Sequence, residues 1–244
     1  MRTVRLYLDQ PLQTGQVLEL DADRSHYLSR VLRVRPGQSL ELFNGSGELF
    51  LARVMDLAGK QVRLKVDHQQ PCRQESPLTI VLAQAVVRGE RMDYLLQKAT
   101  ELGATRFELV WTERCEVRLA GKRLDNRLRH WREVVLHAAQ QSGRCRLPPV
   151  ITPVPLRDWL HHDRPYPPLA LHPQAEQGLK TLPLSVTEEI TLLIGPEGGF
   201  SEDELSRMQA AGCRPVRLGP RILRTETAGP AAITALQLLH GDLG

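Results

Sequence analysis

Two short segments combine glycine, proline and charged residues directly after apolar runs. Residues 190–194 end at Gly195-Pro196-Glu197-Gly198-Gly199, and residues 215–218 end at a segment that continues to Ala228. No Gly-Lys-Ser/Thr follows, which excludes a P-loop, and the dinucleotide pattern Gly-x-Gly-x-x-Gly is absent. A glycine turn still lets the backbone approach a ligand closely, and exposed amides and carbonyls can read an adenine edge. The alternative is a pair of tight turns without a ligand.

The elements around these turns favour a ligand site. Ligands of open α/β sheets bind at the carboxyl ends of the strands, so we predict the active centre here. Ser201 and Glu204 have the spacing of a capping box, which starts a helix directly after the glycine turn. A last helix is expected near residues 225–240, and Pro230 predicts either a start near Gly229 or a kink.

The chain divides into two parts with different periodicity. Residues 1–72 alternate short apolar runs with turn residues and predict an all-β domain. One short helix is expected over residues 24–33, with Asp23 as its N-cap. Residues 71–77 contain two prolines and predict a linker. Strands near 78–83, 106–111 and 168–171 then alternate with helices near 92–102 and 125–141, which predicts a parallel α/β sheet over residues 73–244.

The charge is distributed unevenly along the chain. Residues 1–146 hold 24 Lys and Arg against 17 Asp and Glu, a net of +7, whereas residues 147–244 hold 8 against 11, a net of −3. A basic N-terminal portion is typical of proteins that bind a polyanion. A solvated basic surface is the alternative, and charge alone does not separate the two.

Composition and cysteine spacing limit the class of protein. The 244 residues are 41% hydrophobic and 25% charged, which is ordinary for a globular protein. No stretch is apolar over the ~18 residues of a membrane span, and the N-terminus lacks a signal-peptide core, so we expect no membrane and a cytoplasmic location. The four cysteines are scattered without metal spacing, which predicts reduced thiols rather than a zinc site or a disulfide framework.

Several longer motifs carry a family resemblance. They occupy residues 26–33, 84–92, 97–103, 138–144, 194–201 and 218–228, and include Arg88-Gly89-Glu90-Arg91-Met92 and Leu223-Arg224-Thr225-Glu226-Thr227. In this order and over nearly the full length, they resemble the RsmE-type 16S ribosomal RNA uracil-N3 methyltransferases of the SPOUT class.

The resemblance implies a fold, a cofactor and a partner. It implies a PUA-like β-barrel over residues 1–72 that holds RNA, a SPOUT α/β domain with a deep trefoil knot over residues 73–244, and a homodimer. S-adenosylmethionine would lie bent in the knot, with no metal. The residues expected to hold it are Leu171, His172, Pro173, Leu193, Ile194, Gly195, Pro196, Glu197, Gly198, Leu218, Gly219, Arg221, Ile222, Leu223, Thr227 and Ala228.

The implied reaction is methylation of N3 of a specific uridine in 16S ribosomal RNA, free or in the small subunit. N3 lies on the Watson–Crick face, so the base must be unpaired or flipped. Glu197 is expected either to take the N3 proton or to cap the next helix. The expected catalytic residues are Arg88, Arg91, Glu197 and Arg224, and the expected RNA contacts are Arg30, Arg33, Arg88, Arg91, Arg114 and Arg144.

Two alternatives stay open, and two positions depart from the family pattern. The alternatives are a SPOUT enzyme that methylates a ribose 2′-hydroxyl and a ribosome-assembly factor that binds RNA without catalysis. Gln140 stands where the family suggests a glutamate, which weakens an acid–base role at that position. Pro230 stands where a small helix former is usual.

Overall fold

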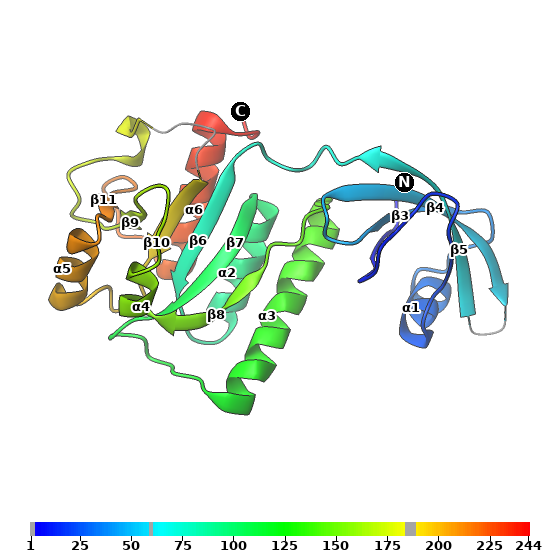
Figure 1. The fold of residues 1–244 in the computed structure, drawn as a ribbon, viewed down its shortest axis with the longest axis horizontal. Helices are drawn as coiled ribbons and strands as arrows, with labels where there is room; N and C mark the ends of the chain where they lie inside the picture. The colour runs from blue at the N-terminus through cyan, green and yellow to red at the C-terminus, as the bar shows by residue number, and fades with distance from the viewer. Residues whose placement is uncertain (1–2, 59–60, 184–188) are drawn as a thin grey trace. The chain divides into compact units, whose positions relative to one another are not determined.

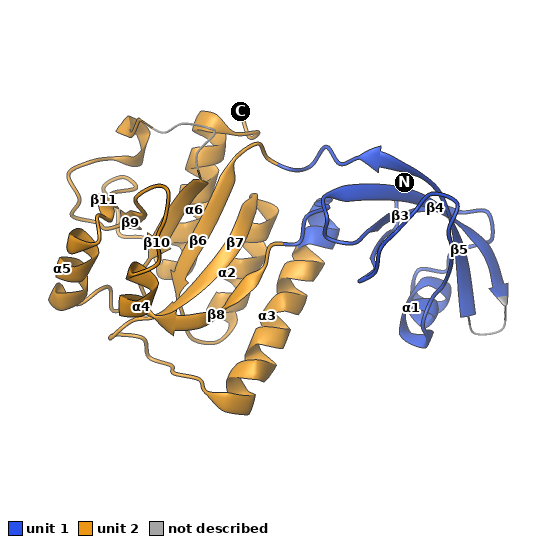
Figure 2. Ribbon diagram, viewed as in Figure 1, with its two compact units in different colours: residues 1–75, 139–147 blue, residues 76–138, 148–244 orange. Residues whose placement is uncertain are grey.

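The computed structural model describes residues 3–58, 61–183 and 189–244. The chain forms two compact units, which Figure 2 colours separately. Unit 1 comprises Met1–Glu75 and Ala139–Leu147, and unit 2 comprises Ser76–Ala138 and Pro148–Gly244. The sequence predicts a boundary at 72/73 and gives no sign that residues 139–147 join the N-terminal unit.

Unit 1 is built on a five-stranded sheet with the order β1-β3-β4-β5-β2. Its strands are β1 (Arg5–Tyr7), β2 (Val17–Glu19), β3 (Ser39–Phe43), β4 (Glu48–Ala58) and β5 (Gln61–Pro71). The β1–β3 pair is parallel and the other pairs are antiparallel. Alternate residues on one face form the core, because successive strand residues point to opposite faces; they include Leu40, Leu42, Phe50, Ala52, Leu64 and Val66.

The helical segment of unit 1 differs from the predicted single helix. An α-helix, α1 (Ala22–His26), passes into a π-helical turn, η1 (Tyr27–Val31). The predicted N-cap Asp23 is wrong: the cap is Asp21, whose side chain accepts from the amide of Arg24 at 2.8 Å. Asp23 lies in the first helical turn instead, where a carboxylate also complements the helix dipole.

A disulfide joins Cys72 to Cys145 within unit 1, with their Cα atoms 6.3 Å apart. The expectation that all four cysteines are reduced thiols is therefore wrong for this pair, whereas Cys115 and Cys213 are free. The two bonded cysteines are 73 residues apart in the sequence. Only the return of residues 139–147 to unit 1 brings them together, and no spacing pattern encodes that return.

Unit 2 contains a six-stranded sheet with the order β11-β9-β10-β6-β7-β8, and every neighbouring pair is parallel (Figure 1). The strands are β6 (Thr79–Ala85), β7 (Ala104–Trp111), β8 (Val150–Pro155), β9 (Leu169–Leu171), β10 (Glu189–Ile194) and β11 (Arg214–Val216). This confirms the predicted parallel α/β architecture. The buried run of β6 fits a strand covered on both faces.

Helices connect the strands of unit 2. They are α2 (Glu90–Glu101), α3 (Gly121–Ser142), α4 (Leu156–Leu160), η2 (Leu179–Thr181), α5 (Glu202–Ala210) and α6 (Thr225–His240). The helix predicted near residues 125–141 is part of α3, and its apolar side chains are buried, since Leu128, Trp131, Val135 and Ala138 are each at most 5% exposed. Helix α3 begins in unit 2, and its last residues belong to unit 1.

The chain around β9 and β11 is interwoven by backbone hydrogen bonds. The amide of Leu179 donates to the carbonyl of Arg217 at 3.1 Å, and the amide of Arg217 donates to the carbonyl of Gln177 at 2.9 Å. The segment between β9 and β10 thus lies against the segment that leaves β11. Helix α6, which follows, packs against η2, β6 and β10.

Helix α6 begins at Thr225 and contains Pro230. This confirms the helix expected near residues 225–240, and the alternative start near Gly229 is not observed. Because proline has no amide hydrogen, the carbonyl of Glu226 lacks the helical donor that residue 230 would otherwise provide. Packing explains how the helix passes this residue, since both Gly229 and Pro230 are buried.

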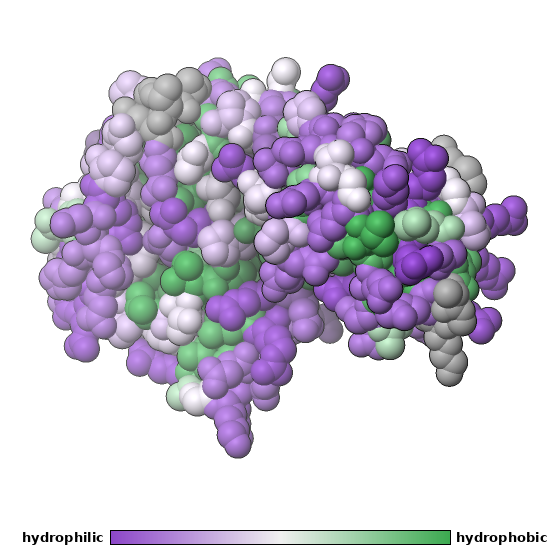
Figure 3. All heavy atoms as spheres, turned by 45° about the vertical axis from the view of Figure 1, so that its right-hand side comes forward, coloured by the Kyte–Doolittle hydropathy of each residue, from purple (hydrophilic) through white to green (hydrophobic). Residues whose placement is uncertain are grey.

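Across the described residues, no helix is both long enough and apolar enough to cross a membrane. Hydrophilic side chains cover most of the face that Figure 3 presents, and apolar side chains appear there in small patches.

Candidate active site

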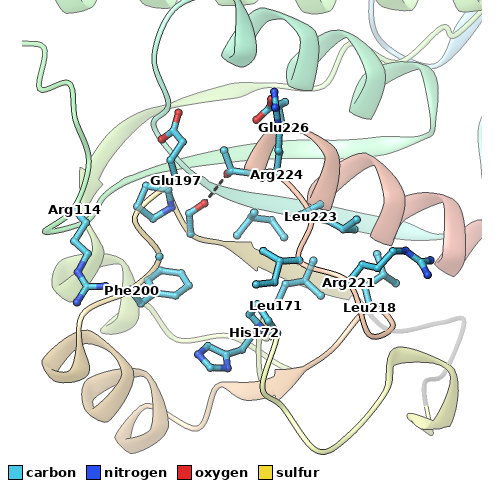
Figure 4. A pocket seen from close by; sticks show the side chains of 18 of the residues that line it. Arg114, Leu171, His172, Glu197, Phe200, Leu218, Arg221, Leu223, Arg224 and Glu226 are labelled. Carbon is cyan, nitrogen blue, oxygen red and sulfur yellow. Dashed lines mark hydrogen bonds between the residues drawn. The ribbon is translucent and has the colours of Figure 1, made fainter.

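A pocket of about 530 Å³ lies in unit 2 where the turns after the parallel strands meet (Figure 4). The end of β9, the glycine turn after β10, the segment after β11 and the first turn of α6 all contribute to its wall. The two segments singled out from their glycine, proline and charge content therefore share one cavity. Its position agrees with the rule that ligands bind at the carboxyl ends of parallel strands.

Most of the residues expected to hold a cofactor line this pocket. Leu193, Gly198 and Thr227 do not line it. Leu193 is a fully buried strand residue, and Thr227 is exposed. The expected residues that do line it are Leu171, His172, Pro173, Ile194, Gly195, Pro196, Glu197, Leu218, Gly219, Arg221, Ile222, Leu223 and Ala228. The arginines Arg91, Arg114 and Arg224 also line it, together with four residues that we did not predict: Gly199, Phe200, Thr225 and Glu226.

The glycine turn is shaped by close packing. A Cβ atom on Gly195 would lie 3.1 Å from the Phe200 ring, so a larger residue at this position would push the ring away from the turn. A Cβ atom on Gly198 would lie 3.1 Å from the Cβ atom of Arg114. Gly199 has a φ of 67°, which side-chain-bearing residues rarely adopt. Gly195, Pro196 and Gly199 of this turn line the pocket.

Thr225 ties the two pocket segments together. Its hydroxyl donates to the carbonyl of Gly195 at 2.6 Å and accepts from the side-chain amide of Gln84 at 3.1 Å. Gln84 is fully buried on β6 and also donates to the carbonyl of Ala85. Buried polar groups are costly unless paired, so this chain of hydrogen bonds fixes the first turn of α6 against the glycine turn.

Two arginines hold the rim of the glycine turn. Arg91, from α2, pairs with Glu197 at 2.9 Å, and Arg114 donates to the carbonyl of Gly198 at 2.9 Å. The structure thus brings together Arg91 and Glu197, two residues that the sequence placed near the reaction. Arg114, expected only as an RNA contact, lines the pocket as well and contacts the backbone of the glycine turn.

The predicted capping box at the start of α5 is confirmed. The Ser201 hydroxyl accepts from the amide of Glu204 at 3.1 Å, and the Glu204 carboxylate accepts from the amide of Ser201 at 3.0 Å. Glu204 is only 4% exposed, and its second oxygen accepts from the amide of Glu113 at 2.8 Å. One carboxylate therefore caps α5 and anchors the loop that carries Arg114.

Two family models match the chain. Residues 74–237 match an RNA methyltransferase domain, and residues 20–67 match an RNA methyltransferase PUA domain. Ribosomal RNA small subunit methyltransferase E from Mycobacterium bovis is 36% identical, over 98% of this chain and 93% of that protein. The protein of the same name from Buchnera aphidicola of Schizaphis graminum is 34% identical, over 99% and 98%. The chain belongs to the RsmE family of RNA methyltransferases.

Solved structures of similar chains agree with this family. The RsmE protein of Neisseria gonorrhoeae, bound to S-adenosyl methionine, has a TM-score of 0.92, 38% identity and full coverage of both chains. A methyltransferase from Legionella pneumophila in complex with the same cofactor has a TM-score of 0.92, 37% identity and full coverage of both chains.

Three of the remaining arginines expected to contact RNA lie away from the pocket wall. Arg88 is exposed in the loop before α2, next to Gly89 with a φ of 64°. Arg30 and Arg33 are exposed in unit 1, and Arg33 has a φ of 52°, the one positive value among the described non-glycine residues. None of these three lines the pocket.

Arg144 occupies a different environment from the one expected of an RNA contact. It is 3% exposed, and its guanidinium pairs with Glu75 at 2.9 Å inside unit 1. The other Glu75 oxygen accepts from the amides of Cys145 and Arg146, each at 2.8 Å. This geometry assigns Arg144 a role in holding the end of α3 to the segment around Glu75.

Gln140, the position that departs from the family pattern, lies one turn earlier on α3 and is half-buried.

Within the described ranges, no group of three or more His, Cys, Asp or Glu side chains could hold a metal ion.

Proposed function

We propose that this chain transfers a methyl group from S-adenosylmethionine to N3 of a uridine in 16S ribosomal RNA of the small subunit. The observation that carries the proposal is the pocket in unit 2, where two turns from a chain of the RsmE family meet around one cavity. Two relatives with similar full-length folds have S-adenosylmethionine bound.

The pocket fits an adenosine group. Its wall includes the apolar side chains of Leu171, Ile194 and Leu218, which suit the face of a base. Gly195, Pro196 and Gly199 of the glycine turn line the same pocket, and such a turn lets the backbone approach a base edge closely. The cofactor supplies an electrophilic methyl group when it is bound.

The chain's own residues prepare the uracil. Orientation of N3 toward the methyl group is the first requirement, since positioning of reactants accounts for a large part of many rate enhancements. Negative charge grows on the uracil oxygens as N3 loses its proton, and arginines stabilise such charge. Arg224 and Arg91 line the pocket and are proposed for this role, with Glu197 holding Arg91 in place. Arg88 is proposed to contact the RNA near this base.

One experiment tests the function directly. 16S ribosomal RNA and small subunits, both lacking the modification, are incubated with labelled S-adenosylmethionine and the protein, and the product nucleoside is identified by mass spectrometry. We expect 3-methyluridine at a single position in one of the two substrates. A ribose-methylated nucleoside would support the 2′-hydroxyl alternative, and no transfer to either substrate would support a non-catalytic RNA-binding factor.

The larger assembly is part of the same proposal. Leu238, Leu239 and Leu243 are 42–56% exposed at the C-terminal end, which supports a homodimer that covers apolar surface.

The hydrogen bonds between residues 177–179 and Arg217 support a trefoil knot around the pocket. Action in the cytoplasm follows from a ribosomal substrate. Light scattering of the purified protein tests the dimer, and a chain trace from crystals tests the knot.

A further inference from the structure

The side chain of Glu226, in the first turn of α6, is a hydrogen-bond acceptor at the pocket without a matching donor in the described part of the chain. Glu226 lines the pocket, and its Oε2 atom is buried with no hydrogen-bond partner among the described residues. A buried acceptor left unpaired costs about 1–3 kcal/mol, so such a group requires an explanation. A ligand that brings an N–H donor would provide one.

The second acid of the pocket is already engaged. Glu197 extends from the glycine turn and pairs with Arg91 at 2.9 Å, whereas Glu226 extends from α6 (Figure 4). To take a proton, Glu197 would first have to release Arg91. Glu226 has no ion pair within 4.0 Å among the described residues, and it follows Arg224 by two positions in the chain.

The Watson–Crick edge of uracil matches this arrangement. It presents an N–H donor at N3 between two carbonyl acceptors, O2 and O4. Glu226 supplies an acceptor, while Arg224 and Arg91 line the same pocket and supply donors. Cytosine has no hydrogen on N3, so an acceptor at this point would oppose it and favour uracil.

We propose that Glu226 accepts the N3 proton of the target uracil and selects uracil over cytosine; this rests on the proposed function. N3 forms a bond to the methyl carbon while the bond from that carbon to the sulfonium sulfur breaks. The N3 proton passes to the Glu226 carboxylate, and the sulfur keeps the electron pair and leaves as a neutral thioether. The nitrogen becomes more acidic as the new bond forms, so a carboxylate suffices as the base. The proton later passes to water.

The test compares Glu226→Gln, Glu226→Asp and wild type in single-turnover methylation of the ribosomal substrate at saturating S-adenosylmethionine. General acid–base residues contribute about 10²–10⁴-fold, so we expect Glu226→Gln to lower the rate at least about 100-fold at neutral pH. Calorimetry should show the dissociation constant for S-adenosylmethionine within about threefold of wild type. The methylation rate of Glu226→Gln should then rise with pH, because hydroxide in the solvent removes the N3 proton. Added formate, which supplies a carboxylate, should partly restore the methylation rate of Glu226→Ala.

Matched variants separate this role from others. Glu202→Gln removes an exposed acid from the first turn of α5, outside the pocket, and should leave the rate unchanged. A methylation rate of Glu226→Gln within threefold of the wild-type rate would overturn the proposal. A variant that binds S-adenosylmethionine more weakly but methylates at the wild-type rate when the cofactor is saturating would also overturn it. If Glu226→Gln unfolds, the Glu226→Asp variant tests the proposal instead. We expect Glu226→Asp to lower the single-turnover methylation rate about tenfold, and an unchanged rate would contradict the proposal. A wild-type protein that makes no 3-methyluridine would refute the proposed function instead.

Discussion

At the scale of single residues, Thr225 connects the two halves of the pocket. We expect Thr225→Val, which removes the hydroxyl and keeps the shape, to leave the carbonyl of Gly195 and the amide of Gln84 without this partner. Loss of such contacts costs about 1–3 kcal/mol, and about 1.4 kcal/mol corresponds to a tenfold change in affinity. Calorimetry should therefore show S-adenosylmethionine binding weakened roughly tenfold.

The control for Thr225→Val lies on the same helix. The hydroxyl of Thr234 donates to the carbonyl of Pro230 at 2.9 Å, and Thr234 does not line the pocket. Thr234→Val should leave cofactor affinity at the wild-type value. Equal losses in both variants would mean that a general loosening of α6 is responsible.

Glu108 on β7 offers a prediction about pH. Its carboxylate accepts from the Trp159 indole at 2.6 Å and pairs with Arg106 and Arg164. Burial raises the pKa of Glu108, but the hydrogen bonds from Trp159 and Arg106 and the nearby arginine charges outweigh it, so the pKa lies below its ordinary value of 4.5. The lowered pKa means that ionised Glu108 stabilises the folded state above pH 4.5, and this contribution is lost as pH falls through the folded pKa.

We therefore expect Glu108→Gln to lower the free energy of unfolding by about 1–3 kcal/mol at pH 7. The difference from wild type should shrink as the pH falls below 4.5. Urea denaturation across this range measures it. Glu116→Gln, at an exposed carboxylate, is the control and should change little. A difference that stays constant down to pH 2 would contradict the ionic origin of the effect.

The residues of the site that sequence reasoning could find are those with unusual local chemistry. The Gly195–Gly199 turn and the arginine-rich motifs stand out in the chain itself. The roles of Thr225 and Gln84 could not be found, because they are 141 residues apart in the sequence and only the sheet brings them together. Arg144 shows the opposite error, since a basic residue in a basic segment proved to be buried against Glu75.

At the scale of elements, the start of α5 sets the position of the loop that carries Arg114. We expect Ser201→Ala, which removes only the cap, to destabilise the protein by about 1 kcal/mol and to leave cofactor affinity nearly unchanged. Glu204→Ala also removes the anchor for the amide of Glu113. It should destabilise the protein more and weaken cofactor binding, as measured by thermal unfolding and calorimetry. Identical effects of the two variants would contradict a role in anchoring the loop.

The success of prediction at this scale followed the strength of local signals. The capping box at Ser201 and the apolar periodicity of α3 were confirmed because each depends on residues within a few turns. The helix expected near residues 225–240 was confirmed, whereas the alternative start at Gly229 that Pro230 suggested was not, and both Gly229 and Pro230 are buried within α6. The π-helical turn after α1 was not predicted, since its pattern resembles that of an ordinary helix end.

At the scale of the whole molecule, alternating patterns predicted the parallel sheet, but long-range returns of the chain were not predicted. The end of α3 joins unit 1, and the disulfide between Cys72 and Cys145 depends on that return.

The charge asymmetry of the sequence has a counterpart on the surface of unit 1. Arg30 and Arg33 are exposed in unit 1, and no carboxylate pairs with either among the residues that the structure describes. Arg24, in contrast, pairs with Asp21.

These unpaired charges predict how RNA binding depends on salt. Each phosphate contact releases bound counterions, so the logarithm of affinity falls with the logarithm of salt concentration by about 0.7–0.9 per contact. We expect Arg30→Ala with Arg33→Ala to reduce this slope by about 1.4–1.8 and to leave cofactor affinity unchanged. Fluorescence anisotropy with a 16S fragment over a salt series measures the slope. Arg24 is neutralised by Asp21, so Arg24→Ala should reduce the slope less. An unaltered slope in the double variant would mean that the RNA binds to another surface.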